Sequence, residues 1–347
     1  MRHVFCRKVV FLLAALLVVC GMSARKPIKT LLITGQNNHN WQVSHVVLKQ
    51  ILENSGRFSV DFAVSPEAGK DMSGFVLDFS PYELVVLDYN GDAWPEETNR
   101  RIVDIISDVN MAYSEHARRY LADCGLPKER TYVTGSPMAE VLHNNLEEIE
   151  ASNIHEKLGL EKGKYILLSA HREENIDTEK NFLSLFNAIN KMAEKYDMPI
   201  LYSCHPRSRN RLVASGFQLD PRVQVQQPLG FHDYNCLQMN AFCIVSDSGT
   251  LPEESSFYAS IGKPISAVCI RTSTERPEAL DKACFILSGI DTKGLLQSVD
   301  LAVQMTKDGN HGIPVPNYTD DVSNKVVKII QSYVGVVDKM VWRKEGL

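Results

Sequence analysis

The sequence predicts an α/β protein with two doubly wound parallel-sheet domains, of which the N-terminal one is incomplete or atypical. The first observation is that short apolar runs alternate with helical segments, as in parallel strands joined by helices. The second is size: the 347 residues are 44% hydrophobic and 23% charged, which suits a globular chain of two domains. The net charge of −5 argues against a nucleic-acid partner.

The N-terminal part of the chain has roughly three strands, fewer than a typical sheet of this kind. A sheet this small is expected to leave an open edge and exposed apolar surface. The apolar patterns place strands at Lys29–Ile33, Phe58–Val64 and Leu84–Leu87, a helix at Val43–Asn54, and a second helix with Ile102, Ile105 and Ile106 on one face.

Strands and helices alternate regularly in the rest of the chain, which predicts a parallel sheet whose ligands bind beyond the carboxyl ends of its strands. A helix is expected after Ser114, a plausible N-cap, and a helical connector over residues 138–158. Strands are expected at Asn110–Tyr113, Thr131–Val133, Tyr165–Ala170, Pro199–Ser203, Val223–Val225, Ala241–Ser246, Ile265–Ile270 and Phe285–Leu287, with a last helix at Val322–Val337.

Two features predict different compartments. Residues 1–24 look like a secretory signal, because basic residues precede an apolar run at Val9–Cys20 that is too short to cross a membrane. A hydrophobic extension that is not cleaved is the alternative. The eight cysteines include no CxxC pair, and most lie in or beside apolar runs, which is typical of the buried, reduced cysteines of a cytosolic enzyme.

The stretch Asp247-Ser-Gly-Thr-Leu-Pro-Glu-Glu254 is the most informative part of the chain. It follows an apolar strand and precedes a helix, and Pro252 suits the first turn of that helix. Amides and the helix dipole at such a start form an anion site, which Ser248 and Gly249 would let a phosphate approach. A carboxylate one turn inside such a helix is well placed to accept hydrogen bonds from sugar hydroxyls. The stretch suggests a nucleotide or nucleotide-sugar site, although a plain turn before a capped helix would look the same.

Four strand ends of the C-terminal series carry charged or titratable groups, and this convergence favours a binding site. Two of these turns are rich in arginine, whose guanidinium groups match the oxygens of a diphosphate. His171 and Glu96 are candidates for proton transfer. Taken alone, a histidine in a turn is usually a surface residue, and Arg276 beside Glu275 is an ordinary ion pair. No metal is expected, because the histidines lack close paired spacing. The turns are His171–Asn175, His205–Arg207, Asp247–Glu254 and Arg271–Glu278.

Five motifs occur in order: Ser169-Ala-His-Arg-Glu-Glu-Asn175, Cys204-His-Pro-Arg207, Asp247-Ser-Gly249, Pro252-Glu-Glu254 and Thr274-Glu-Arg-Pro-Glu278. Together they resemble the non-hydrolysing UDP-N-acetylglucosamine 2-epimerases, from about Pro95 to the C-terminus. The resemblance implies a GT-B-like fold, in which two Rossmann-like domains flank the active-site cleft. It also implies a homodimer that acts on UDP-GlcNAc and UDP-ManNAc; no cofactor is expected.

The resemblance implies a reaction that eliminates UDP to a glycal and adds it back with inversion at C2 of the sugar. That chemistry needs a base for the C2 proton, groups that hold the departing diphosphate, and carboxylates that manage protons. By motif, His171 is similar to a catalytic histidine and Glu96 to a catalytic carboxylate, and Glu254 would hold the ribose hydroxyls. The residues similar to substrate or UDP ligands are Arg172, Glu173, His205, Ser248, Gly249, Glu254 and Arg276.

The N-terminal part departs from the family pattern. Gly-Thr-Arg-Pro-Glu, Gly-Asp-Thr and His-Val-Glu-Ala-Gly segments, which supply an arginine and two more catalytic carboxylates in the family, do not occur. Leu31–Trp41 and Val85–Gly91 instead resemble the exported ThuA-like family, whose fold is flavodoxin-like. That match runs from about Lys29 to Trp94 and would explain a signal peptide. We interpret the chain as a ThuA-like fragment joined near residues 92–97 to most of an epimerase, by natural recombination or by an assembly artefact.

This interpretation divides the chain into a signal-like segment (1–24), a ThuA-like fragment (25–94), the end of an epimerase N-terminal domain with a connector (95–150), and a UDP-binding Rossmann-like domain with a C-terminal helix (151–347). Four interpretations of the function remain: an epimerase weakened by missing carboxylates, a UDP-binding remnant, a poorly folding chimera and a GT-B glycosyltransferase. The turns at His171 and Thr274–Glu278 favour the epimerases. The family works in the cytoplasm, whereas a signal would direct export to the periplasm or outside.

Overall fold

The computed structural model describes residues 26–36, 40–67, 70–89, 96–176, 178–318 and 321–344, except for the side chains of 96–100, 173, 174 and 207. The chain divides into two compact units, residues 1–106 with 333–347 and residues 107–332. The domain boundaries expected at residues 24, 94 and 150 stay predictions. The signal-like segment and most of the join near residues 92–97 lie outside the described residues.

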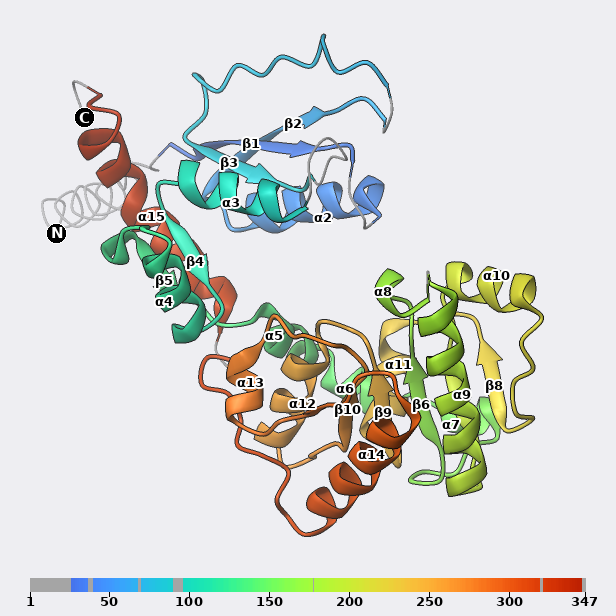
Figure 1. Cartoon of the computed structure of the whole chain (residues 1–347). Helices are drawn as coiled ribbons and strands as arrows, with labels where there is room; N and C mark the ends of the chain where they lie inside the picture. Colours follow the sequence, from blue (N-terminus) through green and yellow to red (C-terminus); the bar gives the residue numbers. More distant parts are fainter. Residues whose placement is uncertain are drawn as a thin grey trace, which may run out of the picture. The chain divides into compact units, whose positions relative to one another are not determined.

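The N-terminal unit contains a parallel three-stranded sheet in the order β2-β1-β3 (Figure 1). All three predicted strands are confirmed. Gly35, which follows β1, has a φ of +122°, and a Cβ there would lie 2.5 Å from the amide nitrogen of Ser65, so a larger residue would clash. The elements are β1 (Ile28–Thr34), α2 (Trp41–Asn54), β2 (Phe58–Val64), β3 (Leu84–Leu87) and α3 (Glu96–Ile106).

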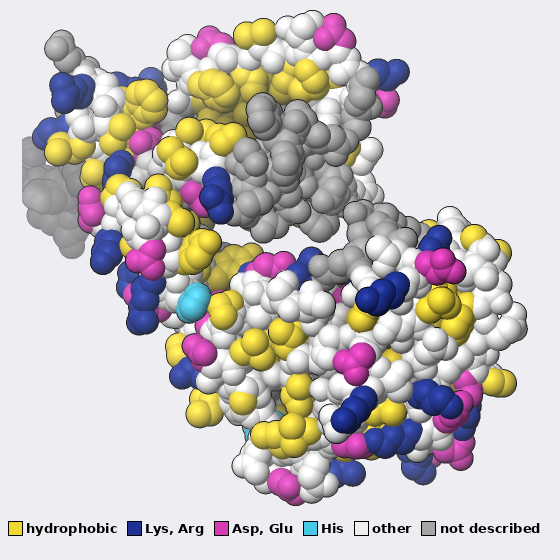
Figure 2. Space-filling model, viewed as in Figure 1, with side chains coloured by type: hydrophobic (Ala, Val, Ile, Leu, Met, Phe, Trp, Pro, Cys, Tyr) yellow, Lys and Arg dark blue, Asp and Glu magenta, His cyan; other side chains and the backbone are white. Residues whose placement is uncertain are grey.

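Much of the apolar surface of this unit is exposed. Helix α2 has no buried residue, although Val43, Val47 and Ile51 form an apolar stripe along it. Figure 2 shows hydrophobic side chains gathered on the visible face of the unit. The exposed apolar surface expected for a three-stranded sheet is therefore present.

The second unit begins with a small parallel sheet and a group of short helices. Ser114 caps α4, as predicted, because its Oγ accepts a hydrogen bond from the Ala117 amide at 3.2 Å. The helical sequence expected over residues 138–158 is confirmed, but it forms three short helices, since the backbone departs from helical geometry at Asn145 and the second helix ends at Glu150. The elements are β4 (Asn110–Ala112), α4 (Glu115–Asp123), η1 (Lys128–Arg130), β5 (Thr131–Val133), α5 (Pro137–Asn144), α6 (Leu146–Glu150) and α7 (Ile154–Leu158).

A six-stranded parallel sheet in the order β11-β10-β9-β6-β7-β8 forms the centre of this unit (Figure 1). All six predicted strands are confirmed within a few residues. The strands are β6 (Ile166–Ser169), β7 (Ile200–Ser203), β8 (Val223–Gln226), β9 (Cys243–Ser246), β10 (Ala267–Cys269) and β11 (Ile286–Leu287). The helices are α8 (Glu173–Ile176), α9 (Glu179–Tyr196), α10 (Pro206–Ser215), α11 (Phe231–Met239), α12 (Leu251–Ser260), α13 (Pro277–Asp281) and α14 (Thr292–Lys307). The last helix, α15 (Val322–Met340), begins in this unit and ends in the other one.

Both faces of the large sheet are buried, which explains why its strands read as continuous apolar runs. Ile166 and Leu168 face a core formed with α9 and α14, whereas Leu167 between them faces a second core formed with α11 and α12. Burying a side chain of this size contributes about 1.5–3 kcal/mol. The alternation fixes the register of β6, because a slip by one residue would exchange the two faces.

The strand order reverses between β6 and β9, because the chain moves from β6 outward to β7 and β8 and then returns to β9. Ser169 pairs with Ser246 at the carboxyl ends of these two neighbouring strands. Ligands of doubly wound sheets bind in the crevice that opens at this point. A ligand site is therefore expected at the loops after β6 and β9.

The sequence predicts buried, reduced cysteines. Five of the six cysteines in the described part of the chain are buried, all six are free, and Cys124 is exposed. Burial raises the pKa of the Cys269 and Cys284 thiols to about 11, so these groups stay protonated at neutral pH. Across the described helices, none combines the length and apolar character needed to span a bilayer.

Candidate functional site

The loops after β6 and β9 meet through one carboxylate, that of Asp247. Its Oδ2 accepts hydrogen bonds from the backbone amides of His171 and Arg172, both at 2.9 Å, and from Nδ2 of Asn175 at 3.1 Å. Its Oδ1 lies 3.1 Å from Nδ1 of the His171 ring. Asn175 also donates to the Ile270 carbonyl at 2.9 Å. A single buried acid thus links the ends of β6 and β9, and Asn175 extends the link to the end of β10.

Asp247 is fully buried, yet its surroundings favour the ionised form. Burial by itself raises the pKa of this carboxyl, but contact with the His171 ring and hydrogen bonds from the two backbone amides outweigh it, so that the pKa is lowered. The group is therefore a carboxylate at neutral pH and can only accept hydrogen bonds.

Arg172 lies across the same loops. Its Nε donates to the Asp247 carbonyl at 3.2 Å, and Nη1 lies 3.7 Å from Oε1 of Glu275. A Cβ added to Gly249 would lie 3.4 Å from Nη2 of Arg172. The absence of a side chain at Gly249 thus leaves room for the guanidinium beside the turn that begins α12.

Glu275 is held by a second arginine. Nη1 and Nη2 of Arg271 donate to its two carboxylate oxygens, both at 2.6 Å, which is a bidentate pair. These hydrogen bonds lower the pKa of Glu275 to about 2. Because Arg271 already occupies both oxygens of Glu275, Arg172 at 3.7 Å is less firmly paired and has donors left for an anion.

The turn before α12 is tighter than the sequence suggested. The Ser248 amide donates to Oγ of Ser246 at 3.0 Å, and the Thr250 amide donates to Oγ of Ser248 at 3.3 Å. Two of the amides expected to be free for a phosphate are therefore used within the turn. Pro252 lies in the first turn of the helix, as predicted.

Glu254 is buried one turn inside α12 with both oxygens engaged. Oγ1 of Thr250 donates to Oε1 at 2.7 Å, and Nε2 of Gln238 donates to Oε2 at 2.5 Å. Burial raises the pKa of this carboxyl above its ordinary value. Each oxygen keeps a second lone pair, so a sugar hydroxyl could still donate to it.

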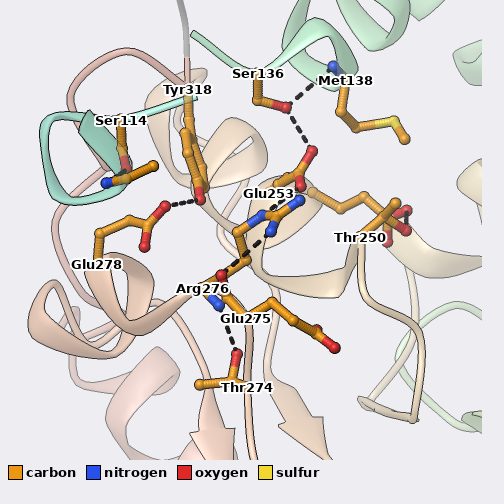
Figure 3. Close-up of polar contacts among 12 residues, drawn as sticks. Ser114, Ser136, Met138, Thr250, Glu253, Thr274, Glu275, Arg276, Glu278 and Tyr318 are labelled. Atoms are coloured by element: carbon orange, nitrogen blue, oxygen red, sulfur yellow. Dashed lines mark hydrogen bonds and ion pairs between the residues drawn. The ribbon is translucent and has the colours of Figure 1, made fainter. Parts of the chain in front are cut away.

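Arg276, at the start of α13, is held by a carboxylate of α12 (Figure 3). Its Nε donates to Oε1 of Glu253 at 2.8 Å, and its guanidinium lies 4.8 Å from the centre of the Tyr113 ring. The Ser136 hydroxyl donates to the other oxygen of Glu253. Burial alone would lower the pKa of Arg276, but the charge of Glu253 and neighbouring groups raise it, so the cation is retained.

The predicted site residues do not all fall into this group. His171, Arg172, Ser248, Gly249 and Glu254 lie in the two loops and helix start described above, and Arg276 follows β10 at the same edge. His205 is exposed just after β7, the neighbour of β6. Glu173 begins α8 and Glu96 begins α3 in the other unit, and the side chains of both lie outside the described residues.

Sequence reasoning missed three residues that shape the site: Asp247, Glu253 and Gln238. The first two stand in motifs that were recognised, and an acid directly after a buried strand was the available signal for Asp247. Nothing in the sequence singles out Gln238, because its role depends on the side-by-side packing of α11 and α12. Among the described residues no three acidic, histidine or cysteine side chains are grouped to hold a metal ion.

The fold and the position of these loops define a doubly wound, Rossmann-type α/β protein. The sequence model of the UDP-N-acetylglucosamine 2-epimerases matches residues 88–331. The chain belongs to this family. Three curated family members from archaea and a bacterium are 28–29% identical to it over 208–238 residues. The matches cover 59–64% of this chain and 53–63% of the relatives, so the chain spans little more than half of their length.

Solved structures support the same fold. The UDP-N-acetylglucosamine 2-epimerase from Rickettsia bellii is 30% identical, with a TM-score of 0.72 over 92% of this chain and 100% of that one. The Methanocaldococcus jannaschii UDP-GlcNAc 2-epimerase, solved in complex with UDP-GlcNAc and UDP, is 20% identical, with a TM-score of 0.69 over 88% and 100% of the two chains. The predicted GT-B-like α/β fold with parallel sheets is confirmed.

A different protein matches a smaller part of the chain. A ThuA-like protein from Parabacteroides merdae is 83% identical over 24% of this chain and 30% of that one, with a TM-score of 0.21.

Proposed function

We propose that the unit of residues 107–332 binds UDP and UDP-GlcNAc beyond the carboxyl ends of β6 and β9, and that the chain interconverts UDP-GlcNAc and UDP-ManNAc. The observation that carries the proposal is the convergence of the His171 and Asp247 loops at the switch point of the sheet, joined by the Asp247 carboxylate. Membership of the epimerase family supports the choice of substrate.

The described side chains suit the parts of such a substrate. Arg172 and Arg276 are cations at the edge where a diphosphate would lie, and Ser248 and Gly249 allow its close approach. Glu254 would accept hydrogen bonds from ribose hydroxyls. His205, Glu173 and Glu96 are assigned by their motifs alone.

In the proposed reaction a base removes the C2 proton, a C1=C2 double bond forms, and the C1–O bond breaks with its electron pair leaving on UDP. The return step forms the C1–O bond again and delivers a proton to the opposite face of C2. His171 is the described group suited to proton transfer. Turnover is expected to be reduced, because the family motifs that supply two further carboxylates do not occur in this sequence.

Calorimetry with UDP on the whole chain tests the binding part of the proposal. We expect a saturable heat that Arg276→Ala weakens and that Arg222→Ala leaves unchanged. Arg222 is a matched control, since it pairs with Asp220 and Asp197 just before β8, at the opposite end of the strands. No heat and no thermal shift at millimolar UDP would contradict the assignment.

Proton NMR with UDP-GlcNAc tests the reaction itself. Appearance of UDP-ManNAc supports an epimerase, whereas binding without product at high protein concentration would assign the chain as a nucleotide-sugar-binding protein. We place this activity in the cytoplasm, where the family works, and propose a homodimer on the same ground. Light scattering checks the second point, and a monomer would contradict it.

A further inference from the structure

Asp247 is the most connected polar group at the switch point, yet no substrate atom can reach it directly, because its side chain is fully buried. Its contacts all run to residues of the β6 loop: the amides of His171 and Arg172, the amide group of Asn175, and the His171 ring. Any effect that Asp247 has on a ligand must therefore pass through these neighbours.

We propose that Asp247 is a positioning residue that keeps the proton of neutral His171 on Nδ1 and so leaves Nε2 as the proton acceptor of the site. The inference deepens the proposed function and rests on it for the substrate. The state of the His171 ring can be measured whether or not the chain turns over, so the two can fail separately.

The donor and acceptor roles follow from the carboxylate. An ionised aspartate only accepts hydrogen bonds, so an imidazole nitrogen 3.1 Å from Oδ1 is favoured as the nitrogen that carries the proton. Nε2 lies on the far side of the ring and points away from Asp247. The His171 side chain is 44% exposed, so a ligand can reach the ring.

No other charged side chain described at this edge competes for the carboxylate. Arg271 and Glu275 pair with each other, and the Arg172 guanidinium donates to the Asp247 carbonyl instead of the carboxylate. When His171 accepts a proton at Nε2, the ring becomes a cation that faces an anion across Nδ1. The Asp247 carboxylate thus orients the ring in both its neutral and its protonated form.

Replacing Asp247 by asparagine should move the proton of neutral His171 to the other ring nitrogen, while the shape of the side chain at position 247 stays the same. Oδ2 of Asp247 accepts from two backbone amides at 2.9 Å and from Asn175, whereas Oδ1 takes only a longer share of the His171 amide at 3.1 Å, so the single oxygen of an asparagine is favoured at the Oδ2 position. Its NH₂ group would then occupy the position of Oδ1 and present a donor to Nδ1 of His171. The ring is expected to respond by moving its proton to Nε2.

The experiment is long-range ¹H–¹⁵N NMR of the whole chain labelled with ¹⁵N-histidine, recorded near pH 8.5, about two units above the ordinary histidine pKa. A His171→Gln variant identifies the His171 signals by their loss. We expect the Nδ1–H tautomer in the unsubstituted chain and the Nε2–H tautomer in Asp247→Asn. Asp300→Asn, on α14, is the matched control and should leave His171 unchanged.

An Nε2–H tautomer in the unsubstituted chain would overturn the proposal, and this result needs no variant to fold. An identical tautomer in Asp247→Asn would also overturn it, and would leave Asp247 as a structural link between loops. His232, whose Nε2 lies 2.9 Å from Oδ1 of Asn145, should keep its tautomer throughout and reports on general unfolding.

If the chain turns over, kinetics give a second readout. Asp247→Asn should lower kcat by roughly 10²–10⁴-fold while KM changes by less than about 3-fold, because a wrong tautomer impairs proton transfer and leaves binding intact. An equal loss in kcat and in UDP affinity would indicate a structural role. If no chain turns over, the proposed reaction fails and the tautomer result still stands.

Discussion

The two sheets of this protein bury their strands to different extents. In the unit of residues 107–332, β9 buries all of its residues and β6 buries all except Ser169. In the other unit, the central strand β1 buries all of its residues except Lys29, but the edge strand β3 buries none of its four residues and helix α2 buries none either. Strands covered on both faces have a complete core of their own, whereas a sheet of three strands leaves apolar side chains in contact with solvent (Figure 2).

This difference matters for function because the candidate site rests on the well-covered sheet. His171 and Asp247 lie in loops that follow strands packed between two hydrophobic cores. The positions of these two side chains are therefore strongly constrained.

The largest expected effect is on stability, from removing a side chain in the large sheet. Leu168→Ala should lower the free energy of unfolding by about 2–5 kcal/mol, because Leu168 is fully buried and its loss leaves a cavity. Val47→Ala in α2 should cost less than about 0.5 kcal/mol, since Val47 is 44% exposed. Urea denaturation measures both. Equal losses would contradict the difference in burial between the two sheets.

Hydrogen exchange should separate the two sheets without any substitution. We expect backbone amides of β6 and β9 to exchange at least about 100-fold more slowly than those of β3, because local opening is easiest where few apolar contacts are broken. Mass spectrometry of peptides from both units gives the rates. Similar protection of β3 would show that its exposed side chains are covered in solution.

A smaller effect is expected on ligand affinity. Glu254→Gln should weaken UDP binding roughly 10–100-fold, the loss that follows from removing a charged hydrogen-bond acceptor worth about 1.5–3 kcal/mol. Calorimetry gives the dissociation constant. Glu53→Gln, in α2 of the other unit, is the matched control, and an affinity loss of the same size there would contradict the assignment of the site.

The smallest effect concerns acid stability. The pKa of Asp247 lies below its ordinary value of 3.8, so the stability that its ionised form contributes is complete above about pH 3.8 and is lost as the pH falls through the lowered value. Asparagine does not titrate, so Asp247→Asn should lose less stability than the unsubstituted chain below that pH. Denaturation curves at pH 5 and pH 3 test this, and parallel losses would contradict it.

The sequence by itself determined the elements and the class of protein. Apolar runs located all six strands of the large sheet, and the Ser114 cap and Pro252 marked helix starts, because propensities and caps act over a few residues. The motifs at strand ends identified the family. Their order along the chain is a local property that needs no knowledge of packing.

Only the tertiary structure decided how the site is held together. Asp247 and His171 are 76 residues apart in the chain and meet because β6 and β9 are neighbours in the sheet. Gln238 reaches Glu254 for the same kind of reason, across two packed helices. Such contacts depend on strand order and helix packing, which a linear pattern does not encode, and they determine the ionisation and orientation of the groups that would touch a substrate.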